Sequence, residues 1–171
     1  METPKPGTGQ FPGQTTQSIL RVLQNYRRVA IVGLSGNPNR PSYFAATYLL
    51  DHGYQIFPVN PGYVGKEILC QKVYGSLDEV PQPIEVVDVF RKTEEVPAIV
   101  DDAIRLGAKV LWLQLGVLHM EARQKALDAG LEVVMDRCMK IEHARFHGGL
   151  NSAGIRTGLI SSRKPKQLIR I

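Results

Sequence analysis

Five short apolar runs recur along the middle of the chain, and they constrain the fold more than any other feature. Most are rich in Val, Ile and Leu and do not alternate with polar residues. The runs are VAIVGL (29–34), IFPVN (56–60), VVDVF (86–90), VLWLQL (110–115) and VVMD (133–136). Such runs are typical of parallel strands that are covered on both faces, so they predict five strands of one sheet.

The segments around these runs carry apolar residues at helical spacing. Either Thr15 or Thr16 could cap the first helix, whose apolar positions extend from Ile19 to Tyr26. Glycines follow the later segments and act as stop signals. These later predicted helices cover residues 44–49, 96–104 and 119–129.

The stretch 61–83 is the exception to this rhythm. There KVYG (72–75) indicates a short extended piece and SLDEV (76–80) a turn of helix. Elsewhere the short connections require helices on the faces of a parallel sheet. The sequence therefore predicts an α/β fold, a Rossmann-like, doubly wound and mainly parallel five-stranded sheet with helices on both faces.

The length of 171 residues fits a single domain. Residues 1–13 are rich in proline and glycine and are expected to form a flexible N-terminal segment. We expect the domain at 14–160 and a basic C-terminal tail at 161–171.

The composition indicates an ordinary globular protein, with 43% hydrophobic and 22% charged residues. No apolar run approaches the roughly 20 residues that span a bilayer, and the N-terminus does not resemble a signal peptide. Cys70 and Cys138 lie far apart and suggest neither a zinc site nor a disulfide framework. We therefore expect no membrane partner, no metal, and a cytoplasmic location.

The net charge of +5 permits an anionic partner, but much of the excess charge lies near the chain ends. A solvated basic tail explains that clustering about as well as nucleic-acid binding does. The basic residues also fall outside the fold-defining strands, and no nucleic-acid motif is present. A nucleic-acid partner is therefore not expected.

Ligands of doubly wound sheets bind beyond the carboxyl ends of the strands. The first such turn, GLSGNPNRPSY, ends a strand at Gly33 and lets the backbone approach an anion at Gly36. Pro41 suits the first position of a helix whose free N–H groups would face the loop, and Arg40 and Ser42 add donors for phosphate. The alternative is a plain strand-to-helix turn.

Two common nucleotide motifs are absent. GLSGNP is not G-x-G-x-x-G, and the second strand ends in Asn60-Pro61 without the acidic residue that holds a ribose in NAD enzymes. No Walker sequence follows Gly36. These absences argue against a dehydrogenase and against an NTPase.

Four stretches together resemble a known family. They are VAIVGLSGNPNRPSY, YLLDHGYQIFPVNPG, VVDVFRKTEEVPAIVDDAIRLGAKVLWLQLGV and AGLEVVMDRCMKIEH, and they cover about residues 17–143. The chain resembles the stand-alone CoA-binding domain proteins, which are similar to the N-terminal domain of the succinyl-CoA synthetase α subunit. The order of PVNPG, WLQLG and MDRC is the specific part of this resemblance.

The resemblance implies that coenzyme A is the cofactor. It places residues 35–38 along the CoA phosphates and residues 61–63 at the nucleotide end, where Tyr63 stands close to the place of an expected lysine and could stack on adenine instead. Residues after the third and fourth strands would line the cofactor. The full set of predicted cofactor-binding residues is Gly33, Ser35, Gly36, Asn37, Pro38, Arg40, Ser42, Asn60, Pro61, Gly62, Tyr63, Phe90, Arg91, Gln114, Leu115, Gly116 and Cys138.

Cys138 has two interpretations. Near a helix start its thiolate would be stabilised, and a thiol cofactor could form a mixed disulfide with it. The alternative is a small buried residue in a tight corner. Asp136 and Arg137 are similarly either ligand contacts or a local ion pair.

No catalytic constellation is evident, and no catalytic residue is predicted. The four histidines are interpreted as surface or capping residues, with His52 and His119 at helix ends and His143 and His147 near the last helix. The leading hypothesis is a non-catalytic module that binds CoA or acyl-CoA as a sensor, carrier or partner subunit. The alternative is a nucleotide-dependent enzyme, either an NAD-type oxidoreductase or an acyl-CoA-using transferase. A homo-oligomer or a partner enzyme subunit is compatible with the fold.

Overall fold

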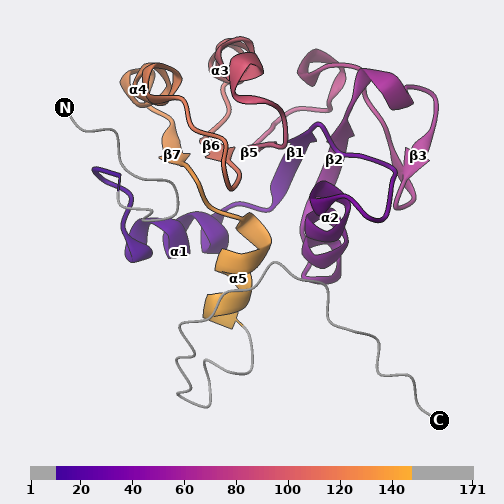
Figure 1. The fold of residues 1–171 in the computed structure, drawn as a ribbon, viewed down its shortest axis with the longest axis horizontal. Helices are drawn as coiled ribbons and strands as arrows, with labels where there is room; N and C mark the ends of the chain where they lie inside the picture. Colours follow the sequence, from indigo (N-terminus) through magenta and orange to yellow (C-terminus); the bar gives the residue numbers. More distant parts are fainter. Residues whose placement is uncertain (1–10, 148–171) are drawn as a thin grey trace.

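The main sheet contains five parallel strands in the order β2-β1-β5-β6-β7 (Figure 1). We obtained this arrangement from a computed structural model, which describes residues 11–147. The strands are β1 (Arg28–Val32), β2 (Gln55–Val59), β5 (Val86–Val89), β6 (Val110–Leu113) and β7 (Glu132–Val134). All five predicted strands and their parallel pairing are confirmed.

Each strand ends one or two residues before the end of the apolar run that predicted it. Leu34, for example, follows β1 but is fully buried, and it belongs to the turn rather than to the strand. Apolar turn residues are expected at the carboxyl edge of a sheet that is buried on both faces. Hydrophobicity alone therefore placed the strands correctly but extended their ends.

Helices cover both faces of the sheet, as predicted (Figure 1). On one face α3 (Val96–Arg105) packs beside α4 (Met120–Asp128). On the other, α5 (Met139–His147) packs against both α1 (Thr16–Asn25) and α2 (Pro41–Asp51). A separate hydrophobic core fills each face. The architecture is thus a three-layer, doubly wound α/β domain.

Local sequence signals explain where the helices begin. Thr15 caps α1, because its hydroxyl accepts a hydrogen bond from the Ser18 backbone while the Ser18 side chain accepts one from Thr15 N. The ring nitrogen of His119 caps α4 by accepting from Ala122 N. Pro41 occupies the first turn of α2, where its missing N–H is not needed.

The region 61–83 contains only short elements, as the sequence indicates. They are the 3-10 helices η1 (Pro61–Tyr63) and η2 (Leu77–Glu79) and the two-residue strands β3 (Glu67–Ile68) and β4 (Gln71–Lys72). A third 3-10 helix, η3 (Thr93–Glu95), leads into α3. Tyr74, in the predicted KVYG piece, forms a parallel bridge with Val59 and so protects the β2 edge.

The opposite edge of the sheet is closed by a side chain. The Gln14 amide donates to Met135 O at 3.0 Å and accepts from Met135 N at 2.7 Å, just beyond β7. Gln14 therefore forms the two hydrogen bonds that a sixth strand would form at this position. Phe11 is also buried, against the α3–α4 core. At Phe11 the structure differs from the flexible segment predicted for 1–13, because this aromatic ring provides a hydrophobic anchor.

The rest of the predicted flexible segment, the end of the predicted domain and the basic tail at 161–171 lie outside the described residues. Within residues 11–147 no helix is long and apolar enough to cross a membrane.

Candidate functional site

A cavity of about 830 Å³ opens at the carboxyl edge of the sheet. It lies where β1 and β5 are neighbours and their connections leave toward opposite faces, the usual ligand position in this topology. Its volume falls within the roughly 300–1,000 Å³ typical of small-molecule and cofactor sites. The residues that line it are Gly33, Ser35, Asn39, Arg40, Pro41, Ser42, Phe44, Phe90, Gln114, Leu115, Val117, Cys138, Lys140 and Ile141.

The turn after β1 forms one wall of this cavity and is held by short-range hydrogen bonds. The buried Ser42 hydroxyl accepts from Ser35 N at 3.1 Å. Ser35 Oγ in turn accepts from Asn37 N, and Asn37 Oδ1 accepts from Asn39 N. Serine and asparagine favour such turns because their side chains bond the backbone two residues on. The predicted donor Ser42 is thus engaged in fixing the loop.

Gly33, just after β1, lies very close to the end of β5. Its φ is +89°, and a Cβ at this position would lie 2.5 Å from the Phe90 carbonyl oxygen and 2.6 Å from Arg91 Cδ. Only glycine combines this backbone conformation with so close an approach. Gly33 therefore lets Phe90 reach the cavity beside the first turn.

The N-terminus of α2 faces the cavity without a side-chain cap. Arg40 is the N-cap residue, its backbone is extended, and its side chain forms no capping bond. The guanidinium is exposed, and no described residue forms a hydrogen bond or ion pair with it. Lys140 approaches the same cavity from the first turn of α5. The positive end of the α2 dipole and two cations together suit an anion such as phosphate.

The remaining walls of the cavity are largely apolar. Phe44, Phe90, Val117 and Ile141 line them, and Leu115 stands at the rim with 51% of its surface exposed. Predominantly apolar walls are usual in cofactor sites. The cavity therefore pairs one cationic end with an apolar remainder.

The residues after β2 lie beside the cavity, but they do not line it. Asn60 connects the two turns, since its amide donates to Leu34 O at 2.9 Å while its Oδ1 accepts from Gly62 N. Tyr63 packs against the backbone of Gly36, where a Cβ would lie 2.9 Å from the ring. Lys66 Nζ lies 5.7 Å from the centre of the Tyr63 ring. A lysine is thus present at this turn, three residues after the position where the resemblance led us to expect it.

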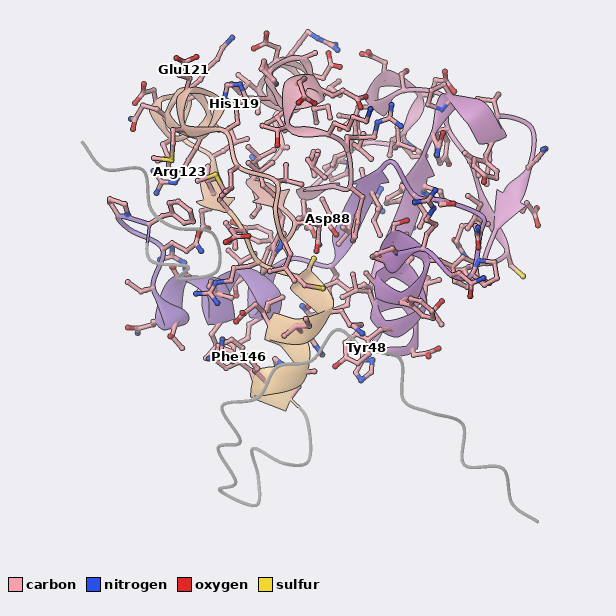
Figure 2. The ribbon with its side chains drawn as sticks, viewed as in Figure 1. Tyr48, Asp88, His119, Glu121, Arg123 and Phe146 are labelled. Carbon is pink, nitrogen blue, oxygen red and sulfur yellow. The ribbon has the colours of Figure 1, made fainter. Side chains whose placement is uncertain are left out.

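A polar group lies beneath the cavity in the interior of the protein. Gln114 Nε2 donates to Asp88 Oδ1 at 2.7 Å, and Asp88 is fully buried in β5 (Figure 2). Burial raises the pKa of Asp88 to about 7, although the hydrogen bond from Gln114 lowers it. The apolar pattern of VVDVF did not indicate that Asp88 would be a buried acid bonded to a cavity residue, and Asp88 was not among the predicted residues.

Cys138 lines the cavity near this pair. Burial raises the pKa of its thiol, and the Asp88 charge raises it further. The expectation of a stabilised thiolate at a helix start is therefore wrong, because desolvation outweighs the backbone hydrogen bonds of α5. The raised pKa favours the alternative, a small, partly buried residue in a corner of the fold.

Arg91, Gly116 and Asp136 have structural partners. Arg91 forms an ion pair with Glu95 at 2.6 Å. Gly116 N donates to Asp136 Oδ1 at 2.8 Å, which fixes the loop after β6. Asp136 is buried with a φ of +56°, an unusual conformation for a residue with a side chain. These three residues shape the carboxyl edge around the cavity.

The structure brings about half of the predicted cofactor-binding residues together around the cavity. Those that line it are Gly33, Ser35, Arg40, Ser42, Phe90, Gln114, Leu115 and Cys138. Those that lie outside its lining are Gly36, Asn37, Pro38, Asn60, Pro61, Gly62, Tyr63, Arg91 and Gly116. Sequence reasoning missed Asn39, Pro41, Phe44, Val117, Lys140 and Ile141. Of these, Lys140 and Ile141 could have been found, because they lie two and three residues after the MDRC stretch that follows the last strand.

Known proteins share this fold over most of their length. The uncharacterized protein YneT of Bacillus subtilis is 40% identical over 126 residues, which are 74% of this chain and 92% of that protein. A hypothetical protein from Pyrococcus horikoshii OT3 has a solved structure with a TM-score of 0.77 and 42% identity, covering 86% of this chain and all of that one.

A larger enzyme subunit contains a similar region. The α subunit of the ADP-forming acetate–CoA ligase I of Pyrococcus furiosus is 31% identical over 98 residues, which are 54% of this chain and 21% of that protein. The family model described as CoA binding domain matches residues 27–144, from the start of β1 into α5. The chain therefore belongs to the CoA-binding domain family.

Proposed function

We propose that the protein binds coenzyme A or acyl-CoA in this cavity as a non-catalytic module, acting as a sensor, a carrier or a partner subunit. The main support for this proposal is the N-terminus of α2, which has no side-chain cap and faces one cavity together with Arg40 and Lys140. The positive end of a helix dipole and adjacent cations attract phosphate groups, and CoA is a multiply phosphorylated nucleotide.

The apolar part of the cavity supports the same ligand. The pantetheine arm of CoA is long, uncharged and amphipathic, and it needs a wall that buries its methyl and methylene groups. Phe90, Leu115 and Ile141 supply such a wall. A site for inorganic phosphate or for a simple nucleotide would not need the exposed aliphatic side chain of Leu115.

The turn after β2 is a candidate contact for the nucleotide end of the ligand. Tyr63 could stack on adenine, and Lys66 beside it could contact a phosphate. Asn60 stands where NAD enzymes carry a ribose-binding acid, and its side chain is already engaged with Leu34 O and Gly62 N. This arrangement argues against NAD as the preferred ligand.

The related ligase subunit suggests how such a module is used. In that protein the similar region is about a fifth of a subunit whose name includes a CoA ligase activity. A partner chain could therefore supply catalysis to a protein that itself only binds the cofactor. Free thiols at Cys70 and Cys138 fit a reducing compartment such as the cytoplasm.

Calorimetric titration of the purified protein with CoA, NAD and ATP tests this proposal. We expect CoA to bind with a dissociation constant in the low micromolar range or below, and NAD and ATP to bind much more weakly. The fragments 3′,5′-ADP and pantetheine serve as controls, and each should bind more weakly than CoA. A preference for NAD over CoA would contradict the proposal and favour a dehydrogenase.

A further inference from the structure

Asp88 is a fully buried ionisable group that the proposed function leaves unused. Its carboxyl group has no exposed surface, and within residues 11–147 the side-chain hydrogen bond it accepts is from Gln114 Nε2 to Oδ1, at 2.7 Å. Oδ2 is enclosed and accepts no hydrogen bond from any residue in the described range. An acid buried in this way is costly, so it calls for an explanation beyond packing.

The direction of the Asp88 side chain connects it to the cavity. Asp88 is in register with Ile31 and Trp112, which belong to the core beneath α1, α2 and α5. Its neighbours Val87 and Val89 face the opposite core. Asp88 therefore lies on the α5 side of the sheet, and Figure 2 shows it near the middle of the molecule above α5. This is the side from which Cys138 approaches the cavity.

Asp88 determines how the amide group of Gln114 is oriented. An ionised carboxylate can only accept hydrogen bonds, so the NH₂ group of Gln114 must turn toward it. The carbonyl oxygen of the same amide then points away from Asp88. Gln114 lines the cavity, and no hydrogen bond from a described residue reaches this oxygen. The buried end of the cavity thus offers the ligand a hydrogen-bond acceptor above a carboxylate.

The buried end of the cavity is also where the arm of the ligand would finish. Phosphates held at the start of α2 leave the uncharged arm to follow the apolar wall of Phe90 and Ile141. Gln114 is only 4% exposed and lines the same cavity, so we take it as the polar group that the end of the arm would meet. A terminal thiol placed here can donate its hydrogen, whereas the carbonyl oxygen of a thioester can only accept and would face another oxygen.

We propose that Asp88, acting through Gln114, makes this site select the free thiol of coenzyme A over its acyl thioesters. The inference rests on the proposed function, because it assumes that the cavity holds CoA. It assigns Asp88 as a positioning residue that does not itself touch the ligand. Replacing Asp88 by Asn would release the Gln114 amide from its fixed orientation. An Asn amide can donate to the Gln114 carbonyl oxygen, so the Gln114 amide group could turn over.

The test compares dissociation constants for CoA and acetyl-CoA by calorimetry at pH 8 under reducing conditions. We expect the native protein to bind CoA about tenfold more tightly than acetyl-CoA, because CoA gains one hydrogen bond to Gln114 and avoids one repulsion between oxygen atoms. In Asp88→Asn the two constants should agree within about threefold. Val87→Ala is the matched control, since it removes buried side-chain volume at the adjacent position on the opposite face of β5. This control should keep the native ratio.

A second variant covers the case in which Asp88→Asn does not fold, as judged by circular dichroism. Gln114→Met keeps a similar side-chain length and removes the carbonyl oxygen, so it should also abolish the preference. Equal affinities in the native protein, an unchanged ratio in folded Asp88→Asn, or a ratio lost equally in Val87→Ala would overturn the inference while leaving CoA binding intact. Failure of the native protein to bind either compound would instead contradict the proposed function itself.

Discussion

Replacing Arg40 by Ala separates ligand binding from support of the turn. The Arg40 guanidinium is exposed, lines the cavity and has no partner among residues 11–147. Its backbone N–H donates to Asn37 O, and its carbonyl accepts from Tyr43 N, so the main chain fixes the turn without the side chain. Removing the guanidinium should therefore change the free energy of unfolding by less than ~0.5 kcal/mol, as for other exposed side chains.

The effect on ligand binding should be much larger. A hydrogen bond between the guanidinium and a phosphate contributes about 1.5–3 kcal/mol, which corresponds to a roughly 10- to 150-fold weaker affinity for CoA after the substitution. Calorimetric titrations at low and high salt measure this effect. The difference between native and variant proteins should shrink as salt rises, because screening weakens an ionic contact.

Lys109→Ala is the matched control for Arg40→Ala. Lys109 is exposed just before β6, at the amino ends of the strands and so away from the cavity. Its loss changes the net charge by the same amount. CoA affinity in this control should stay close to the native value. Equal affinity losses in both variants would mean that only net charge matters. A loss in Arg40→Ala that follows a fall in melting temperature would mean that Arg40 holds the turn and not the ligand.

Four further substitutions or conditions test other parts of the account. In urea unfolding, Gly33→Ala should destabilise the protein more than Gly53→Ala does. Both glycines have a positive φ, which alone costs about 1–3 kcal/mol in another residue. At Gly33, but not at Gly53, a Cβ would also meet the backbone of Phe90. Equal losses would show that the close approach to β5 is unimportant. Gln14→Leu leaves two buried backbone groups of Met135 unpaired, at about 1–3 kcal/mol each, and Gln14→Glu should be less harmful because it can still accept from Met135 N. Thermal melting measures this, and an unchanged melting temperature in Gln14→Leu would refute the edge-closing role. Burial lowers the pKa of His143 to about 4, below the ~6.5 of the unfolded chain. The neutral imidazole therefore contributes fully to the free energy of unfolding above pH 6.5. As pH falls toward 4, this contribution is lost by up to about 1.4 kcal/mol per pH unit, because the unfolded chain takes up the proton first. Urea unfolding at pH 7 and pH 5 should show this loss in the native protein and a smaller one in His143→Phe. Cys138 should react with iodoacetamide at neutral pH far more slowly than the exposed Cys70, and faster labelling of Cys138 on peptide mapping would contradict its raised pKa.

The strands could be predicted from sequence because the sheet is covered on both faces. A run such as VLWLQL is then almost entirely apolar, and its short length favours a strand over a buried helix. The helices were predicted from their apolar spacing together with Thr15, Pro41 and the terminal glycines. What these patterns do not contain is the order of the strands, which depends on long-range packing and places β5 beside β1.

The site was predicted less completely than the fold, for two physical reasons. Residues after β1, β5 and β6 were found by the rule that ligands bind at the carboxyl edge. Lys140 and Phe44 reach the cavity from helices, and that rule does not consider helix residues. Asp88 was not singled out and His143 was interpreted wrongly, because burial of a polar side chain depends on its tertiary neighbours. His143 lies against Tyr48 and Tyr54 rather than at the surface.

The most direct test of the account is an NMR titration of the ¹⁵N-labelled protein with CoA. If CoA binds in the cavity, the largest chemical-shift changes should fall on the backbone amides of Ser35, Ser42 and Phe90 and on the side-chain amide of Gln114. Lys109 and its neighbours at the opposite edge of the sheet should be unaffected. Shifts concentrated at that opposite edge, or the absence of any shift at saturating CoA, would contradict the central claim.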